Sequence, residues 1–105
     1  MVARSRAATG PFETLAQATG ASQSVILERS ADWNAPGHNS VVRDARGDAW
    51  LFYHAIDARR SRGAPSAATD GRRVLLADRL IFRNGWPAIA RGQPSSTPQP
   101  APIAP

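Results

Sequence analysis

The chain has 105 residues, enough for one small domain, and it has no cysteine, which excludes a fold held by disulfides. Its net charge of +5 comes entirely from arginine, since lysine is absent, and the arginines are scattered without a nucleic-acid-reading motif. No segment approaches the roughly 20 apolar residues of a membrane span, and the N-terminus lacks the apolar stretch of a signal peptide. These features predict neither a nucleic-acid nor a membrane partner, and they assign no compartment.

The first part of the chain reads as short segments separated by turn signals. Residues 2–6 alternate as on a strand, and the T-G-P sequence at residues 9–11 predicts a turn. Residues 12–18 favour a helical turn or an irregular loop, which Gly20 ends. The β-branched run S-V-I-L-E at residues 24–28 predicts a further strand.

A β-hairpin is predicted at the centre of the chain. A loop over residues 29–39, bent at its Pro-Gly pair, leads into strands at residues 40–43 and 49–56, joined by a turn in which Gly47 supplies a positive φ. The second strand has one face formed by Trp50, Phe52, His54 and Ile56 and another formed by Leu51, Tyr53 and Ala55. Because both faces are largely apolar, we expect this strand to be covered on both sides, as in a propeller blade.

The last third of the chain also favours strands. A long loop over residues 58–71 precedes expected strands at residues 72–77 and 78–83, and the Asn-Gly pair at residues 84–85 is a strong hairpin signal before a return strand at residues 86–89. No long amphipathic helix is predicted, so the expected fold is all-β, an antiparallel β-meander of short strands.

The C-terminal residues differ in composition from the rest. Residues 91–105 are rich in proline, which disfavours strand pairing, and we expect them to be an extended, disordered tail. The predicted organisation is therefore one folded unit over residues 1–90 followed by the tail.

The two histidines are the first candidates for a functional site. His38 follows the Pro-Gly bend at the mouth of a predicted strand, where ligands often bind, but a single histidine is weak support for a metal site. The alternative for His38 is local hydrogen bonding of its loop. His54 lies in an apolar strand and is predicted to be a buried, hydrogen-bonded structural residue.

The acidic residues are candidates for the two carboxylates that flank the scissile bond in a glycosidase. The candidates are Glu13, Glu28, Asp32, Asp44, Asp48, Asp57, Asp70 and Asp78. Asp44 and Asp48 flank a turn and are expected to cap its backbone groups. None lies in an apolar pocket that the sequence can identify, and such a pocket is what raises the pKa of an acid for proton donation, so we assign no catalytic residue.

Four stretches carry a family resemblance. They are V-A-R-S-R-A-A-T-G-P-F (residues 2–12), S-V-I-L-E (24–28), A-P-G-H-N-S-V-V-R-D-A-R-G-D-A-W-L-F-Y-H-A-I-D (35–57) and R-R-V-L-L-A-D-R-L-I-F-R-N-G-W-P (72–87). In this order they resemble the last blade and a half of the five-bladed β-propeller of glycoside hydrolase family 43, the arabinanase and β-xylosidase family. The resemblance covers about residues 2–90.

The resemblance implies the C-terminal fragment of an enzyme that hydrolyses O-glycosyl bonds in arabinan- or xylan-type plant polysaccharide. In the family, the histidine that matches His38 points into the central channel and contacts a metal ion, usually calcium, partly through water. His38 is therefore the one expected metal-site residue. The family's catalytic Asp and Glu residues lie upstream of the matching part, so we expect this chain to be inactive alone. Family members are mostly secreted.

Two rival functions remain open at this point. One is a non-catalytic carbohydrate-binding module, in which Trp33, Trp50, Tyr53 and Trp86 grip sugar rings. The other is a small basic β-domain that binds nucleic acid through its arginines. If the chain is a piece of a propeller, its apolar faces and unpaired edge strands predict self-association of the isolated polypeptide.

Overall fold

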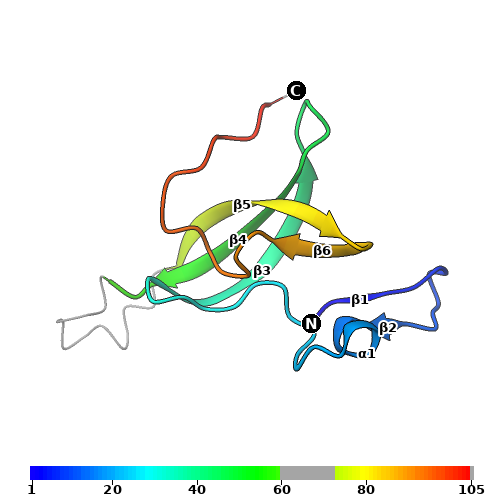
Figure 1. Cartoon of the computed structure of the whole chain (residues 1–105). Coiled ribbons are helices and arrows are strands. Elements are labelled where there is room, and N and C mark those ends of the chain that lie inside the picture. Colours follow the sequence, from blue (N-terminus) through cyan, green and yellow to red (C-terminus); the bar gives the residue numbers. More distant parts are fainter. Residues whose placement is uncertain (60–72, 105) are drawn as a thin grey trace.

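The structure is a computed structural model that describes residues 1–59 and 73–104, and most of its regular secondary structure is β (Figure 1). The elements are β1 (Ala3–Arg4), β2 (Glu13–Thr14), α1 (Leu15–Thr19), β3 (Trp33–Arg43), β4 (Ala49–Asp57), β5 (Arg73–Arg83) and β6 (Trp86–Ile89). The last four form one antiparallel meander in the order β3-β4-β5-β6. The predicted all-β antiparallel class is confirmed. Within the described residues, no helix is long and apolar enough to cross a membrane.

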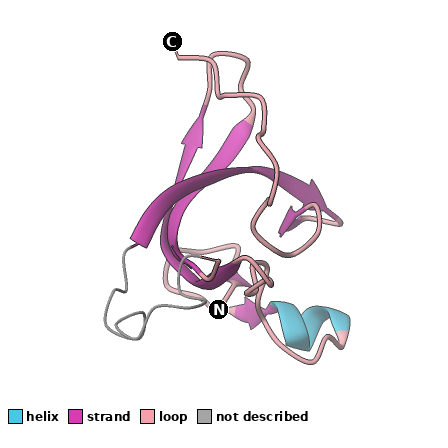
Figure 2. Ribbon diagram, turned by 90° about the vertical axis from the view of Figure 1, so that its left-hand side faces the viewer, coloured by secondary structure: helices cyan, strands magenta, loops and turns pink. Residues whose placement is uncertain are grey.

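The four-stranded sheet is strongly curled, as Figure 2 shows. Both predicted hairpins are present. The turn between β3 and β4 has Gly47 at φ 82°, and the turn between β5 and β6 has positive φ at both Asn84 (51°) and Gly85 (76°). These are the backbone conformations that tight hairpin turns require, so the glycines and the asparagine fix where the sheet reverses direction.

The core lies against one face of this sheet. Its buried members are Ala49, Leu51, Tyr53, Leu80 and Ile89. Ile26 and Leu27, from the segment before β3, pack against this cluster and cover it. On the other face, Phe52 and His54 are only half-buried, and Leu75, which lies opposite His54, is 71% exposed. This chain therefore seals only one of the two faces of β4 that were predicted to be covered.

The predicted loop over residues 29–39 is wrong, because β3 already begins at Trp33. The strand accommodates its Pro-Gly pair through register shifts on either side of Gly37, with positive φ at Ala35 (48°) and His38 (52°). Irregularities of this kind place extra residues in one strand and bend it without ending the pairing. The turn signal thus marks a bend inside a strand.

The predicted strand at residues 24–28 is also wrong, since no strand is found there in the described structure. The backbone of this segment bonds outside any ladder: Val2 N donates to Ser24 O (2.8 Å), and Glu28 N donates to Gly92 O (2.7 Å). Two of its apolar side chains, Ile26 and Leu27, pack against the core, whereas Val25 is exposed. The apolar run therefore reflects partial burial and not strand pairing.

The two strands expected at residues 72–77 and 78–83 are one continuous strand, β5. A charged residue, Asp78, interrupts the apolar run in the middle. It is nevertheless buried at 4% exposure, and its carboxylate accepts hydrogen bonds from Tyr53 and Ser95. Because these donors satisfy the carboxylate, the strand continues through it.

The N-terminal part forms a small separate sheet. The strand expected over residues 2–6 is confined to Ala3–Arg4, which pairs with β2. The helical alternative for residues 12–18 is confirmed by α1, whose N-terminus is closed by a capping box between Thr14 and Gln17 and whose C-terminus ends at a left-handed Gly20.

The segment after β6 forms no strand in its described part, residues 90–104. It is not detached from the sheet, because Pro94 is buried and Ser95 bonds to β3 and β5. The boundary at residue 90 and the disorder of residues 91–105 stay predictions. From residue 60 onward, the loop expected over residues 58–71 lies outside the described residues.

Candidate functional site

His38 lies in the bent part of β3, where its positive φ departs from regular strand geometry, and its side chain is exposed. It lines a cavity of about 340 Å³ together with Pro36 and Asn39 of the same bend. Apolar residues that include Leu27 and Leu51 complete the lining. The bend therefore presents an imidazole to a cavity of mixed polar and apolar lining.

The other histidine lies beside it. The rings of His38 and His54 stack, with centroids 5.4 Å apart and an interplanar angle of 24°. The register shifts of β3 bring Gly37 opposite His54, so that the next residue along the bend meets the ring on β4. The sequence prediction named both histidines but did not pair them. Extending the hairpin register from Val42 opposite Trp50 would have placed them together.

His54 is held by an arginine from the third strand. Arg73 Nη1 lies 3.0 Å from His54 Nδ1 and donates to Ala35 O, also at 3.0 Å. An arginine can only donate, so Nδ1 is the acceptor and the neutral ring carries its proton on Nε2. The predicted hydrogen bonding of His54 is confirmed, but the residue is half-buried and not buried. Arg73 thus ties β5 to the bend of β3 across β4.

These residues do not fit a calcium site by themselves. Calcium takes six to eight oxygen ligands, mostly carboxylates and carbonyls. Around His38 the chain offers two imidazole rings, and among the described residues no three His, Cys, Asp or Glu side chains gather where they could hold a metal ion. His38 can supply at most one contact to an ion whose other ligands come from elsewhere.

Several carboxylates have structural partners. Asp44 accepts hydrogen bonds from the backbone N–H groups of Arg46 and Asp48 and from the Trp50 indole, at 2.9–3.1 Å. Burial alone would raise the pKa of Asp44, but these hydrogen bonds outweigh it and hold the pKa below its ordinary value. The predicted turn-capping role of Asp44 is confirmed. Asp48 forms an ion pair with Arg79 (2.8 Å).

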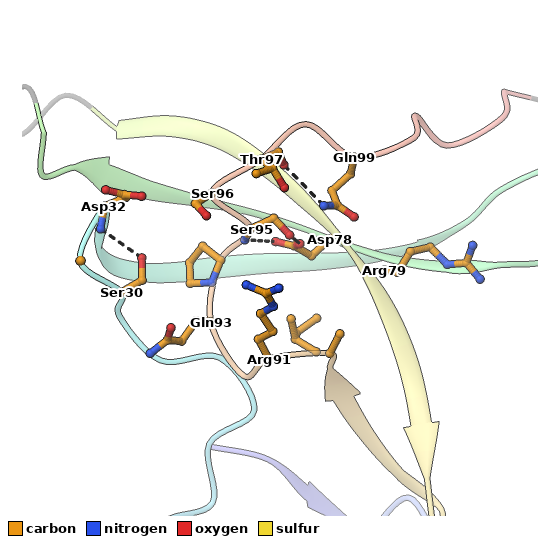
Figure 3. Close-up of a pocket in the computed structure, with 14 residues that line it drawn as sticks. Ser30, Asp32, Asp78, Arg79, Arg91, Gln93, Ser95, Ser96, Thr97 and Gln99 are labelled. Atoms are coloured by element: carbon orange, nitrogen blue, oxygen red, sulfur yellow. Dashed lines mark hydrogen bonds between the residues drawn. The ribbon is translucent and has the colours of Figure 1, made fainter.

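The buried carboxylate of Asp78 was missed as a structural centre. It accepts from the Tyr53 hydroxyl at 2.5 Å. It also accepts from both the hydroxyl and the backbone N–H of Ser95 (Figure 3). Ser95 O in turn accepts from the Trp33 indole (3.2 Å). Burial raises the pKa of Tyr53 far above its ordinary value, and the hydrogen bond to Asp78 and the charge of Asp78 raise it further. Ser95 is therefore bonded directly to β3 and β5 and is linked to β4 through Asp78 and Tyr53.

Each tryptophan is covered by an arginine. The guanidinium carbons of Arg4, Arg59 and Arg79 lie 4.2, 4.9 and 5.5 Å from the ring centroids of Trp86, Trp33 and Trp50, respectively. All three distances are within the range of cation–π attraction. The rings themselves are only 5%, 7% and 3% exposed. None of the three presents a free face on which a sugar ring could stack.

Comparison with known families identifies the chain. The sequence model described as "Glycosyl hydrolases family 43" matches residues 1–87, which is most of the sequence. The chain belongs to glycosyl hydrolases family 43. Neither the search of curated proteins nor the search of solved structures gave a match.

The match to family 43 confirms the resemblance drawn from the sequence motifs. It includes the bend with His38 and the Asn-Gly hairpin, and it ends within β6, at Pro87. The curled, four-stranded antiparallel sheet of this family-43 chain is compatible with part of a β-propeller.

Proposed function

We propose that this family-43 chain is the C-terminal part of a hydrolase that cleaves O-glycosyl bonds in arabinan- or xylan-type polysaccharide. In this proposal the chain supplies the His38 wall of the active site, and the catalytic acid and base come from other parts of the enzyme. The observation that carries the proposal is the family match over residues 1–87.

The described carboxylates support the proposal that the catalytic acid and base lie in other parts of the enzyme. Asp32 and Asp78 line one cavity, but Asp78 is 4% exposed and held by Tyr53 and Ser95. A glycosidase needs one carboxyl group that can donate a proton and a second that can activate water or attack the sugar. The Asp78 carboxylate is buried and already accepts these hydrogen bonds, so it is not placed to transfer a proton at a scissile bond. We therefore propose that the chain alone does not hydrolyse glycosides.

The half-open face of the sheet supports the propeller assignment. Val42, Phe52 and Leu75 lie on the face opposite the core, and Leu75 and Val42 are 71% and 49% exposed. Neighbouring blades of a propeller cover such faces. In this proposal an adjacent sheet of the same enzyme covers them, and the isolated chain self-associates through them.

We keep calcium as a proposal for the assembled enzyme only. His38 would contribute a contact through water, with the oxygen ligands supplied by other blades. A carbohydrate-binding module that grips sugars with tryptophan is not proposed, since the indole rings are buried and covered.

Two experiments test this function. The full chain is first assayed alone on nitrophenyl arabinofuranoside and xyloside and on soluble arabinan and xylan, where we expect no hydrolysis. The chain then replaces the corresponding C-terminal segment of an active family-43 enzyme, where we expect hydrolysis to be retained. In that chimaera His38→Ala should lower activity by about tenfold, the usual effect of losing an outer-shell metal partner.

The matched control is Arg46→Ala, a change in the exposed hairpin turn, which should leave the activity of the chimaera unchanged. Hydrolysis by the chain alone would contradict the proposal that the catalytic acid and base come from other parts of the enzyme. A folded chimaera without activity, or one insensitive to His38→Ala, would contradict the role given to this segment.

A further inference from the structure

A second cavity is lined by residues other than those around His38. It has a volume of about 420 Å³ and is enclosed by residues 30–32, the middle of β5 and the segment from Ile89 to Gln99 (Figure 3). Pockets for small molecules have volumes of about 300–1,000 Å³, so this one is large enough for a ligand. It shares no lining residue with the cavity of His38.

The lining is rich in groups that form hydrogen bonds. The polar side chains are those of Ser30, Asp32, Asp78, Arg79, Arg91, Gln93, Ser95, Ser96, Thr97 and Gln99. Within residues 1–59 and 73–104, the side chains of Arg91, Gln93 and Ser96 make no hydrogen bond or ion pair with the protein. Figure 3 shows the Arg91 guanidinium directed toward the Asp78–Ser95 pair. Unused donors and acceptors therefore face the cavity.

The mixture of charges limits the ligand class. Asp32 would repel a small anion, while Arg91 would repel a cation, and the surrounding hydroxyl and amide groups do not favour an apolar molecule. A neutral ligand with many hydroxyl groups can both donate to Asp32 and accept from Arg91, whose planar fork suits two adjacent oxygens.

One wall of the cavity is held in place by hydrogen bonds within the chain before any ligand binds. Ser95 is held by three hydrogen bonds, two to Asp78 and one from Trp33, and Pro94 beside it is buried. Asp78 is itself held by Tyr53. A wall that is ordered before binding loses less conformational freedom when a ligand arrives, which favours affinity.

We infer that this cavity, between residues 30–32, β5 and the segment that follows β6, binds a short neutral oligosaccharide, with Arg91 and Gln93 as its main contacts. The inference rests on the proposed function for its ligand class. A site of this kind would hold a polysaccharide chain against the protein in addition to any contacts near His38.

The test uses the full chain with xylohexaose and arabinohexaose as probes. Ligand-observed saturation-transfer NMR, which tolerates self-association, detects binding, and calorimetry gives the affinity. We expect at least one probe to bind, and Arg91→Ala and Gln93→Ala each to weaken it, Arg91→Ala by about tenfold, as expected for loss of a charged hydrogen bond. Arg46→Ala removes an exposed arginine that does not line the cavity and should have no effect.

Failure of this site is distinguishable from failure of the proposed function. The site is refuted if neither probe binds, or if Arg91→Ala and Gln93→Ala bind like the unchanged chain. If His38→Ala abolishes binding while Arg91→Ala does not, the sugar lies in the His38 cavity and this inference is wrong. The chimaera assay tests the proposed function independently of all these outcomes.

Discussion

Tyr53 is the group expected to control the stability of the chain at alkaline pH. The sequence has one tyrosine and neither lysine nor cysteine, so Tyr53 is the one side chain whose ordinary pKa lies between about 9 and 12. In the folded chain it is 1% exposed and donates to Asp78, and its pKa is raised. The native state therefore keeps the proton that the unfolded state releases above its pKa of about 10.

The size of the effect follows from this one proton. The stabilisation is complete below about pH 10 and is lost as the pH rises toward the native pKa, at about 1.4 kcal/mol of unfolding free energy per pH unit. Relative to neutral pH, the loss at pH 12 is about 2.7 kcal/mol, which is a large part of the stability of a small domain.

Urea unfolding followed by tryptophan fluorescence from pH 8 to pH 12 measures this dependence at fixed protein concentration. The unchanged chain should lose stability above pH 10, whereas Tyr53→Phe should show no such dependence. At pH 8 the variant should be less stable by about 1–3 kcal/mol, because a buried carboxylate loses a donor. Parallel pH profiles for the two proteins, or phenolate absorbance appearing near pH 10 in the folded chain, would refute the reasoning.

Three further predictions concern the tail, a turn and the open face. Ser95→Ala should lower the unfolding free energy, measured in urea, by about 1–2 kcal/mol. The control Ser96→Ala removes an unbonded hydroxyl and should change it by less than about 0.5 kcal/mol. Equal effects of the two changes would show that Asp78 does not hold the tail. Gly47→Ala should cost about 1 kcal/mol because of its positive φ, and Gly37→Ala, with an ordinary φ and open space around it, should cost less. Leu75→Arg should reduce self-association in sedimentation velocity, and an unchanged distribution would exclude this face as the contact.

The hairpins were predictable because their signal is local. Gly47 and the Asn84-Gly85 pair supply backbone conformations that other residues disfavour, and no distant contact is needed to fix them. The bend of β3 was not predictable in the same way. A Pro-Gly pair normally ends a strand, and here the partner strand β4 continues the pairing past it with positive φ at Ala35 and His38.

The candidate site was predicted in part. His38 was identified from its position in a motif, but Arg73, which contacts His54 and Ala35 beside it, comes from a strand much later in the chain, and no local pattern indicates those contacts. Asp78 is similar. An aspartate inside an apolar run indicates either a break or a buried carboxylate, and only the positions of Tyr53 and Ser95 in the folded sheet decide between the two.

The arginines over the three tryptophans give a structural reason for the use of arginine, and not lysine, in this chain. A guanidinium group is flat and stays ionised at every pH at which proteins fold, so it can shield an indole ring from water without being part of the apolar core. Lysine would preserve the charge of +5 but offers a compact ammonium group that leaves most of the ring uncovered. A variant with lysine in place of every arginine would thus keep the net charge, but the indole rings of its three tryptophans would lose the guanidinium groups that cover them.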